Sequence, residues 1–193
     1  TILYPAISYP TYAMGATLGG CRAVAVPVDD RWRIDLSAIS DDDARRALAL
    51  WVNTPGNPAG GLDDLEAAAA WGRERAIPVF SDECYAEFTW DGPPRSILTA
   101  GRHDRFEGLV AVHSLSKRSN FAGCRLGYYA GDADLVVAAP TLLRAQTDLI
   151  RWRSESMRMA SLGTSGSVNR QVVDEAQQKL GAAEAALKEA TAA

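Results

Sequence analysis

The chain has few of the residues that mark metal-binding or disulfide-rich proteins. Its 193 residues include only three cysteines and two histidines. Cys21, Cys84 and Cys124 are widely spaced, odd in number and form no Cys-x-x-Cys pair. We therefore expect buried thiols of a reducing compartment rather than disulfides, and no metal site.

Long apolar runs and an excess of basic charge are absent as well. No stretch approaches the roughly 18 consecutive apolar residues of a membrane-spanning helix, and the N-terminal residues do not resemble a signal peptide. A formal net charge of −4 offers no basic surface for nucleic acid. With 47% hydrophobic and 23% charged residues, the chain can bury a core. We expect a cytoplasmic globular protein that binds neither membrane nor nucleic acid.

Short apolar runs alternate with helical patterns along the first three quarters of the chain. The expected strands are 1–4, 23–28, 48–52, 78–81, 108–114 and 126–130, and the expected helices are 12–19, 36–44 and 63–75. Asp63 and Asp64 open the last of these helices, where their charge opposes the helix dipole. The alternation predicts an α/β fold, with a mostly parallel sheet flanked by helices and ligands bound at the carboxyl ends of the strands.

One polar segment sets a lysine among groups that suit a phosphorylated aldehyde. The segment His113–Tyr128 contains the pattern Ser-x-Ser-Lys and an arginine eight residues after the lysine. Lys117 can form an imine with an aldehyde, while Ser114, Ser116 and Arg125 can bind a phosphate. Pyridoxal phosphate carries both groups. A polar loop with an ordinary surface lysine is the alternative.

Two further segments place polar side chains after expected strands. The turn Asn53–Gly60 leaves Asn57 with its amide beyond the end of one strand. The run from Ile77 ends in Asp82, with Tyr85 three residues later. A buried aspartate is costly unless it meets a cation, and a protonated pyridine nitrogen is such a partner.

In this order, Asn-x-Pro-Gly-Asn-Pro-x-Gly, Asp-Glu-x-Tyr and Ser-x-Ser-Lys with its later arginine resemble the large domain of class I/II pyridoxal-phosphate-dependent aminotransferases of the aspartate aminotransferase fold. The resemblance covers roughly residues 1 to 145. Within that family, the segments 9–12 and 114–127 look most like the actinobacterial succinyldiaminopimelate aminotransferases of lysine and cell-wall biosynthesis.

The resemblance implies a role for each polar residue. Lys117 would hold the cofactor and move the substrate proton, and Asp82 would keep the pyridine nitrogen protonated. Asn57 and Tyr85 would bind the ring's phenolate oxygen. The phosphate would be held by Ser114, Ser116 and Arg125. Tyr85 as a half-buried strand-end tyrosine and Arg125 in a surface ion pair are the simpler alternatives.

The segment before the first expected helix matches the place where such enzymes stack a side chain on the cofactor ring. Tyr9 or Ile7 is the candidate for this contact. Tyr9 packed in an ordinary turn is the alternative.

From about residue 147 the pattern changes. Apolar residues step by four and three at Val172, Ala176, Leu180, Ala183, Leu187 and Ala190, which predicts a long helix with a heptad seam. The wording of 158–176 is similar to the tip of the α-helical hairpin of periplasmic adaptor proteins. We expect a partial aminotransferase large domain over 1–146 and a helical segment over 147–193; an ordinary helix pair covering the sheet is the alternative.

The resulting function is amino transfer between an amino acid, with succinyldiaminopimelate as the candidate, and a keto acid, in an enzyme that forms homodimers. The resemblance places a phosphate-binding turn before Thr1 and a substrate-binding arginine in a later domain, so we expect the chain alone to be inactive. The alternatives are a non-catalytic module that acts through its C-terminal helices, and a lyase or acyltransferase of the same fold.

Overall fold

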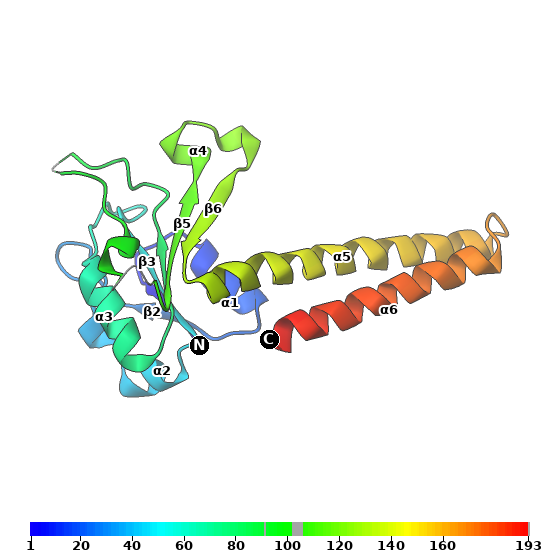
Figure 1. Ribbon diagram of the computed structural model, residues 1–193, viewed down its shortest axis with the longest axis horizontal. Coiled ribbons are helices and arrows are strands. Elements are labelled where there is room, and N and C mark those ends of the chain that lie inside the picture. The colour runs from blue at the N-terminus through cyan, green and yellow to red at the C-terminus, as the bar shows by residue number, and fades with distance from the viewer. Residues whose placement is uncertain (91, 102–105, 193) are drawn as a thin grey trace. The chain divides into compact units, whose positions relative to one another are not determined.

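A computed structural model describes residues 1–90, 92–101 and 106–192, and these residues divide into two compact units, Thr1–Ala133 and Asp134–Ala193. The first unit holds all six strands (Figure 1). The strands are β1 (Ile2–Pro5), β2 (Ala23–Val26), β3 (Ala49–Asn53), β4 (Val79–Asp82), β5 (Leu109–Ser114) and β6 (Gly127–Gly131). Its helices are α1 (Thr11–Leu18), α2 (Asp41–Arg46), α3 (Leu65–Arg75) and α4 (Leu115–Arg118), with 3-10 turns η1 (Leu36–Ala38), η2 (Ile97–Ala100) and η3 (Ala122–Cys124).

The sheet has the order β2-β1-β3-β4-β5-β6. The five strands β1 to β5 run parallel, as the alternating pattern predicts, and β6 is antiparallel to β5. Gly131 closes this last pair at a φ of 141°, and a Cβ there would overlap the carbonyl oxygen of Leu109. Glycine is therefore required where β6 meets β5.

The two faces of the sheet are covered by different helices (Figure 1). On one face, Leu50, Val52 and Val79 are fully buried in a cluster that includes residues of α3 and η2. On the other face, beside α1, the rings of Trp51 and Phe80 lie 5.2 Å apart. Alternate residues of β3 thus fill two separate apolar layers.

The boundaries of two expected helices differ from the structure. The segment 36–44 is not one helix, because Ser40 has an extended backbone conformation. The side chain of Ser40 accepts a hydrogen bond from the amide of Asp43, so Ser40 is the N-cap of α2. Asp63 does not open α3. Asp64 is its N-cap, and the side chain of Asp63 is buried in the preceding loop.

The second unit consists of α5 (Ala133–Thr164), except for its first residue, and α6 (Arg170–Ala192). The first of these helices begins earlier than expected, directly after β6. On α6 the predicted seam is the less exposed face from Ala176 onward, with Ala176 and Ala183 buried at 5% and 6% exposure. Its first member is wrong, because Val172 is 37% exposed and Val173 is half-buried instead. The ammonium of Lys179 lies 4.8 Å from the ring centre of Trp152, and a Cβ at Gly163 would meet Val173. The two helices therefore pack against each other. No helix in the described residues is long and apolar enough to cross a membrane.

Candidate active site

Three parallel strands end at one edge of the sheet, and each is followed by predicted site residues. Asn53 and Asp82, the last residues of β3 and β4, are paired in the sheet register. Ser114 is the last residue of the neighbouring strand β5. Asn57, Tyr85 and Lys117 follow these three strand ends within four residues. Parallel strands thus bring together segments that are some thirty residues apart in sequence.

Asp82 is held by two donors from different parts of the chain. The hydroxyl of Tyr12 donates to Oδ2 at 2.6 Å, and the amide of Cys84 donates to Oδ1 at 3.1 Å. Each carboxylate oxygen therefore keeps a lone pair for a further donor. Burial, and after it the charge of Asp82, holds the pKa of Tyr12 well above its usual range, so this hydroxyl stays a donor at neutral pH.

Tyr12 is a site residue that the sequence analysis missed. Its side chain is only 7% exposed, and its ring lies 5.3 Å from that of Trp51 beneath α1. The hydroxyl at the end of this packed ring donates to Asp82. Nothing in the sequence connects Tyr12 to a residue 70 positions later.

The turn that carries Asn57 is tied to the end of β3. Asn57 donates its backbone amide to Oδ1 of Asn53 at 2.8 Å. The amide of Gly56 donates to the carbonyl oxygen of Gly61, and Gly60 donates to Gly56 in turn. The turn is therefore closed by its own backbone, with the half-buried Asn57 within it.

Lys117 lies over an aromatic ring at this edge. Its Nζ is 5.7 Å from the ring centre of Tyr85, and it forms no ion pair within the described residues. Burial first, and then Asp82, raise the pKa of the nearby Cys84 thiol to about 12. Asp82, Cys84, Tyr85 and Lys117 thus form one group, with the amine exposed.

The segment around α4 brings the predicted phosphate ligands close in part. The hydroxyl of Ser114 accepts from the amide of Ser116 and lies 2.9 Å from its hydroxyl. Leu115 donates its amide to the carbonyl of Leu126, so the residue after Arg125 lies beside this turn. The guanidinium of Arg125 donates to the carbonyl of Ala122 and is otherwise exposed. Neither Tyr9 nor Ile7, 53% and 38% exposed, has a described contact with Asp82.

Two buried carboxylates near the site were not predicted. Asp63 accepts from the amides of Ile34 and Asn53, and burial raises its pKa to about 6. Glu83 accepts from the amide of Ile97, and its Oε2 lies 3.0 Å from Nε2 of His113 without a well-directed hydrogen bond from any described residue. Both carboxylates join loops to the strand ends. A position next to Asp82 in the sequence was the only signal for Glu83.

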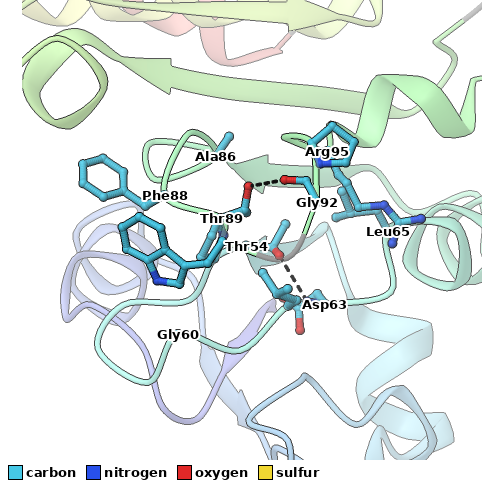
Figure 2. Close-up of a pocket in the computed structure, with 13 residues that line it drawn as sticks. Thr54, Gly60, Asp63, Leu65, Ala86, Phe88, Thr89, Gly92 and Arg95 are labelled. Carbon is cyan, nitrogen blue, oxygen red and sulfur yellow. Dashed lines mark hydrogen bonds between the residues drawn. The ribbon is translucent and has the colours of Figure 1, made fainter.

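Two hollows lie beside the site residues, and neither is lined by all of them. One, of about 460 Å³, lies beneath α1 and is lined by Tyr12, Trp51 and Asp82 among others. The other, of about 500 Å³, lies between the loops that follow β3 and β4 (Figure 2). Figure 2 shows Phe88 on one side of it, Arg95 on the other and Asp63 at its base. The predicted residues therefore share an edge of the sheet, and neither of these two hollows encloses them all.

The side chains present suit pyridoxal phosphate. Asp82 has lone pairs for a pyridinium N–H, two neighbouring hydroxyls and a guanidinium suit a phosphate, and an unpaired amine suits an aldehyde. The residues that supply these groups are Asp82, Ser114, Ser116, Arg125 and Lys117.

Comparisons with known proteins identify the family of the chain. The family described as aminotransferase class I and II matches residues 1–189. The 4-dedimethylamino-4-oxo-anhydrotetracycline transaminase of Streptomyces rimosus is 38% identical over 143 residues, which cover 70% of this chain and 36% of that protein. The LL-diaminopimelate aminotransferase of Aquifex aeolicus is 34% identical over 142 residues, again 70% of this chain and 36% of that protein. The chain thus spans about a third of the length of these curated relatives.

A solved structure extends the match to the C-terminal helices. The probable N-succinyldiaminopimelate aminotransferase of Thermus thermophilus superposes with a TM-score of 0.66 at 25% identity, covering 98% of this chain and 47% of that protein. Members of the matched family use pyridoxal phosphate. By its match over residues 1–189, the chain belongs to the class I and II aminotransferases.

Proposed function

We propose that this chain is the cofactor-binding part of a pyridoxal-phosphate-dependent transaminase, which moves an amino group between an amino acid and a keto acid. The observation that supports this most directly is the position of Lys117. Its amine lies over the ring of Tyr85, three residues after Asp82, whose carboxylate still has room for a donor. An unpaired amine and a held carboxylate at one sheet edge are the two groups that this chemistry needs.

When bound, pyridoxal phosphate supplies a ring that withdraws electrons from the substrate's α-carbon. Lys117 would bind its aldehyde carbon covalently and, once displaced, carry the proton that leaves the α-carbon. Asp82, fixed by Tyr12 and by the amide of Cys84, would hold the ring nitrogen in its protonated form. Because two donors already orient Asp82, it would be in position before the cofactor arrives.

The remaining site residues would orient the ring. Asn57 and Tyr85 would donate to the phenolate oxygen, and the phosphate would be held by Ser114, Ser116 and Arg125. Anchors at opposite ends of the ring would restrict its rotation, which keeps the reacting carbon beside Lys117.

We further propose an amino-acid substrate of the diaminopimelate class, with succinyldiaminopimelate as the candidate. The names of the Thermus thermophilus and Aquifex aeolicus proteins support this class. The Streptomyces rimosus relative is named for a tetracycline intermediate instead. Turnover by the whole enzyme with succinyldiaminopimelate, compared with LL-diaminopimelate and alanine as amino donors, would decide among these substrates.

A cytoplasmic homodimer is the proposed state of the whole enzyme, by analogy with the family. The C-terminal helices we assign to the same enzyme, because the family match runs to residue 189 and the Thermus thermophilus structure covers 98% of the chain. The similarity of 158–176 to adaptor-protein hairpins is the competing interpretation. It predicts that residues 134–193 alone bind a partner protein, which a pull-down with purified adaptor partners would test.

The test of the proposed function is covalent attachment to Lys117. Pyridoxal phosphate added to the protein should give a visible absorbance band, and borohydride should fix the cofactor to Lys117, as read by peptide mass spectrometry. Lys117→Ala should abolish both results, whereas Lys188→Ala, on the exposed face of α6, should keep them. A band that survives in Lys117→Ala would contradict the proposal. In the whole enzyme, loss of the band on adding an amino donor, with release of the matching keto acid, would separate a transaminase from a lyase.

A further inference from the structure

A single buried amide connects the two loops that carry the ring-binding residues. Asn53, the last residue of β3, is 5% exposed. Its Oδ1 accepts the backbone amide of Asn57 at 2.8 Å, and its Nδ2 donates to the carbonyl oxygen of Asp82 at 3.0 Å. One side chain therefore contacts the backbone of both residues that would bind the cofactor ring at different atoms.

The two contacts need an acceptor and a donor at the same position. A carboxamide supplies both on one planar group, whereas an apolar side chain supplies neither and a hydroxyl is too short to span two loops. The carbonyl of Asp82 also accepts the amide of Thr54 at 3.3 Å, so Asn53 fills its second lone pair. Replacing Asn53 would leave the half-buried amide of Asn57 without this acceptor and the carbonyl of Asp82 with the amide of Thr54 alone.

The backbone of Asn53 is held as well. Its amide donates to Oδ2 of Asp63, whose other oxygen accepts from Ile34 and whose amide donates to the hydroxyl of Thr54. Asn53 thus has a fixed main chain and a side chain with both polar ends engaged, which limits it to one arrangement.

We propose that Asn53 is a positioning residue, which sets the distance between Asn57 and Asp82 and so the fit of the cofactor ring between them. This inference rests on the proposed function for its consequence, but the clamp itself can be tested without cofactor. Asn53 would touch no cofactor atom. It would act through the backbone of Asn57 and Asp82, whose side chains would bind the phenolate oxygen and the ring nitrogen.

The first test uses the ligand-free protein and amide hydrogen exchange. The amide of Asn57 and the side-chain amide of Asn53 should exchange slowly in the wild type, because both donate inside the protein. Asn53→Leu, of similar size, should raise exchange at Asn57 at least roughly tenfold. Thr54→Val is the matched control, since it removes a buried hydrogen bond of the same turn but no contact with Asn57. Fast exchange at Asn57 in the wild type, or equal exchange in both variants, would overturn the clamp.

The second test uses the protein with pyridoxal phosphate. Asn53→Leu should weaken cofactor binding roughly tenfold and shift the pH midpoint of the cofactor's visible absorbance, since both ring contacts would change. Thr54→Val should do neither, even if it lowers the melting temperature. In an Asn57→Ala background Asn53→Leu should have a smaller effect, because one of its two routes is gone. Equal effects in both backgrounds would refute action through Asn57.

The two proposals fail in different ways. A wild-type protein that does not bind pyridoxal phosphate refutes the proposed function, while the exchange of Asn57 still decides whether Asn53 holds the turn. If binding occurs but Asn53→Leu leaves both the affinity and the pH midpoint unchanged, the positioning role is wrong and the proposed function stands.

Discussion

The hydrogen bond from Tyr12 to Asp82 gives the sharpest prediction about the site. Tyr12→Phe removes one hydroxyl and keeps the ring that packs 5.3 Å from Trp51, so no cavity is made. The lost bond is short, at 2.6 Å, and ends on a carboxylate. Hydrogen bonds to charged groups contribute about 1.5 to 3 kcal/mol.

The lower end of that range should apply. Asp82 is half-buried, so water can replace the lost hydroxyl as a donor to Oδ2. Its other oxygen, Oδ1, keeps the hydrogen bond from the amide of Cys84. We expect Tyr12→Phe to lower the free energy of unfolding by about 1.5 kcal/mol, roughly a tenfold change in the folded-to-unfolded ratio. The effect should be constant from pH 7 to pH 9, because the pKa of Tyr12 lies above its usual range.

Urea unfolding followed by circular dichroism measures this change. Tyr129→Phe, which removes an exposed hydroxyl, should stay within about 0.5 kcal/mol of wild type. In an Asp82→Asn background the loss of the Tyr12 hydroxyl should cost less, because the acceptor is no longer charged. A Tyr12→Phe variant as stable as Tyr129→Phe, or an equal cost in both backgrounds, would refute the role assigned to this bond.

Three further predictions concern buried groups and a close backbone approach. Burial raises the pKa of Asp63 from 3.8 to about 6. The contribution of this raised pKa to the stability of the folded protein is fully present below pH 4 and is lost as the pH rises through 6. The stability of wild type relative to Asp63→Asn should fall by up to about 3 kcal/mol between pH 4 and pH 7.5, and a pH-independent difference in urea unfolding would contradict this. With its pKa raised to about 12, Cys84 should react with iodoacetamide at pH 8 more than roughly a hundredfold more slowly than the exposed Cys124; mass spectrometry showing equal rates would count against the burial described. Gly131→Ala should cost at least about 2 kcal/mol by thermal unfolding, while Gly123→Ala, which has open space around it, should be near neutral; similar melting temperatures would oppose the close approach of β6 to β5.

The sheet could be predicted because its signal is local. Short apolar runs between polar turns place strands within two or three residues of β1 to β6, and alternating helices indicate parallel pairing. Whether β6 runs parallel or antiparallel to β5 could not be predicted in this way, because an apolar run has the same pattern in either direction. The length of the connection after β5 gave no signal either, because residues 115–126 reach the dozen that a parallel crossover needs.

The prediction of one helix over 36–44 was wrong, although the sequence contains the capping pattern that marks the true start of α2. Ser40 is followed by three aspartates and then two arginines, a pattern typical of a helix start and end. Apolar spacing from Leu36 to Ala44 was given more weight than this capping pattern. Asp63 was wrongly placed in the helix, because either of two adjacent aspartates fits the N-cap pattern and Asp64 is the one used. Only the fold shows that the side chain of Asp63 accepts a hydrogen bond from the buried amide of Ile34.

The roles of the site residues and their supports are predictable to different degrees. Asp82 ends a strand, and Asn57 and Lys117 follow strand ends within four residues, so topology alone places them at one edge of the sheet. Tyr12 and Asn53 act through contacts that cross 70 and 29 positions of the chain. A polar residue that holds a site residue in place has the same local sequence pattern as a polar residue in an ordinary turn. Its contact with the site residue is therefore seen only in the structure.

The C-terminal helices show why a pattern can predict packing without identifying a protein. From Ala176 onward the step of four and three along α6 marks its less exposed face, with Ala176 and Ala183 buried, whereas Val172 is exposed. A seam of this kind specifies the spacing of contacts with a neighbouring helix and nothing more, because any antiparallel helix pair satisfies it. Family membership of 170–189 comes instead from their continuity with the strands in one family match. Resemblance of a short helical segment to a hairpin of another family therefore weighs less than a match that includes Lys117 and the helices together.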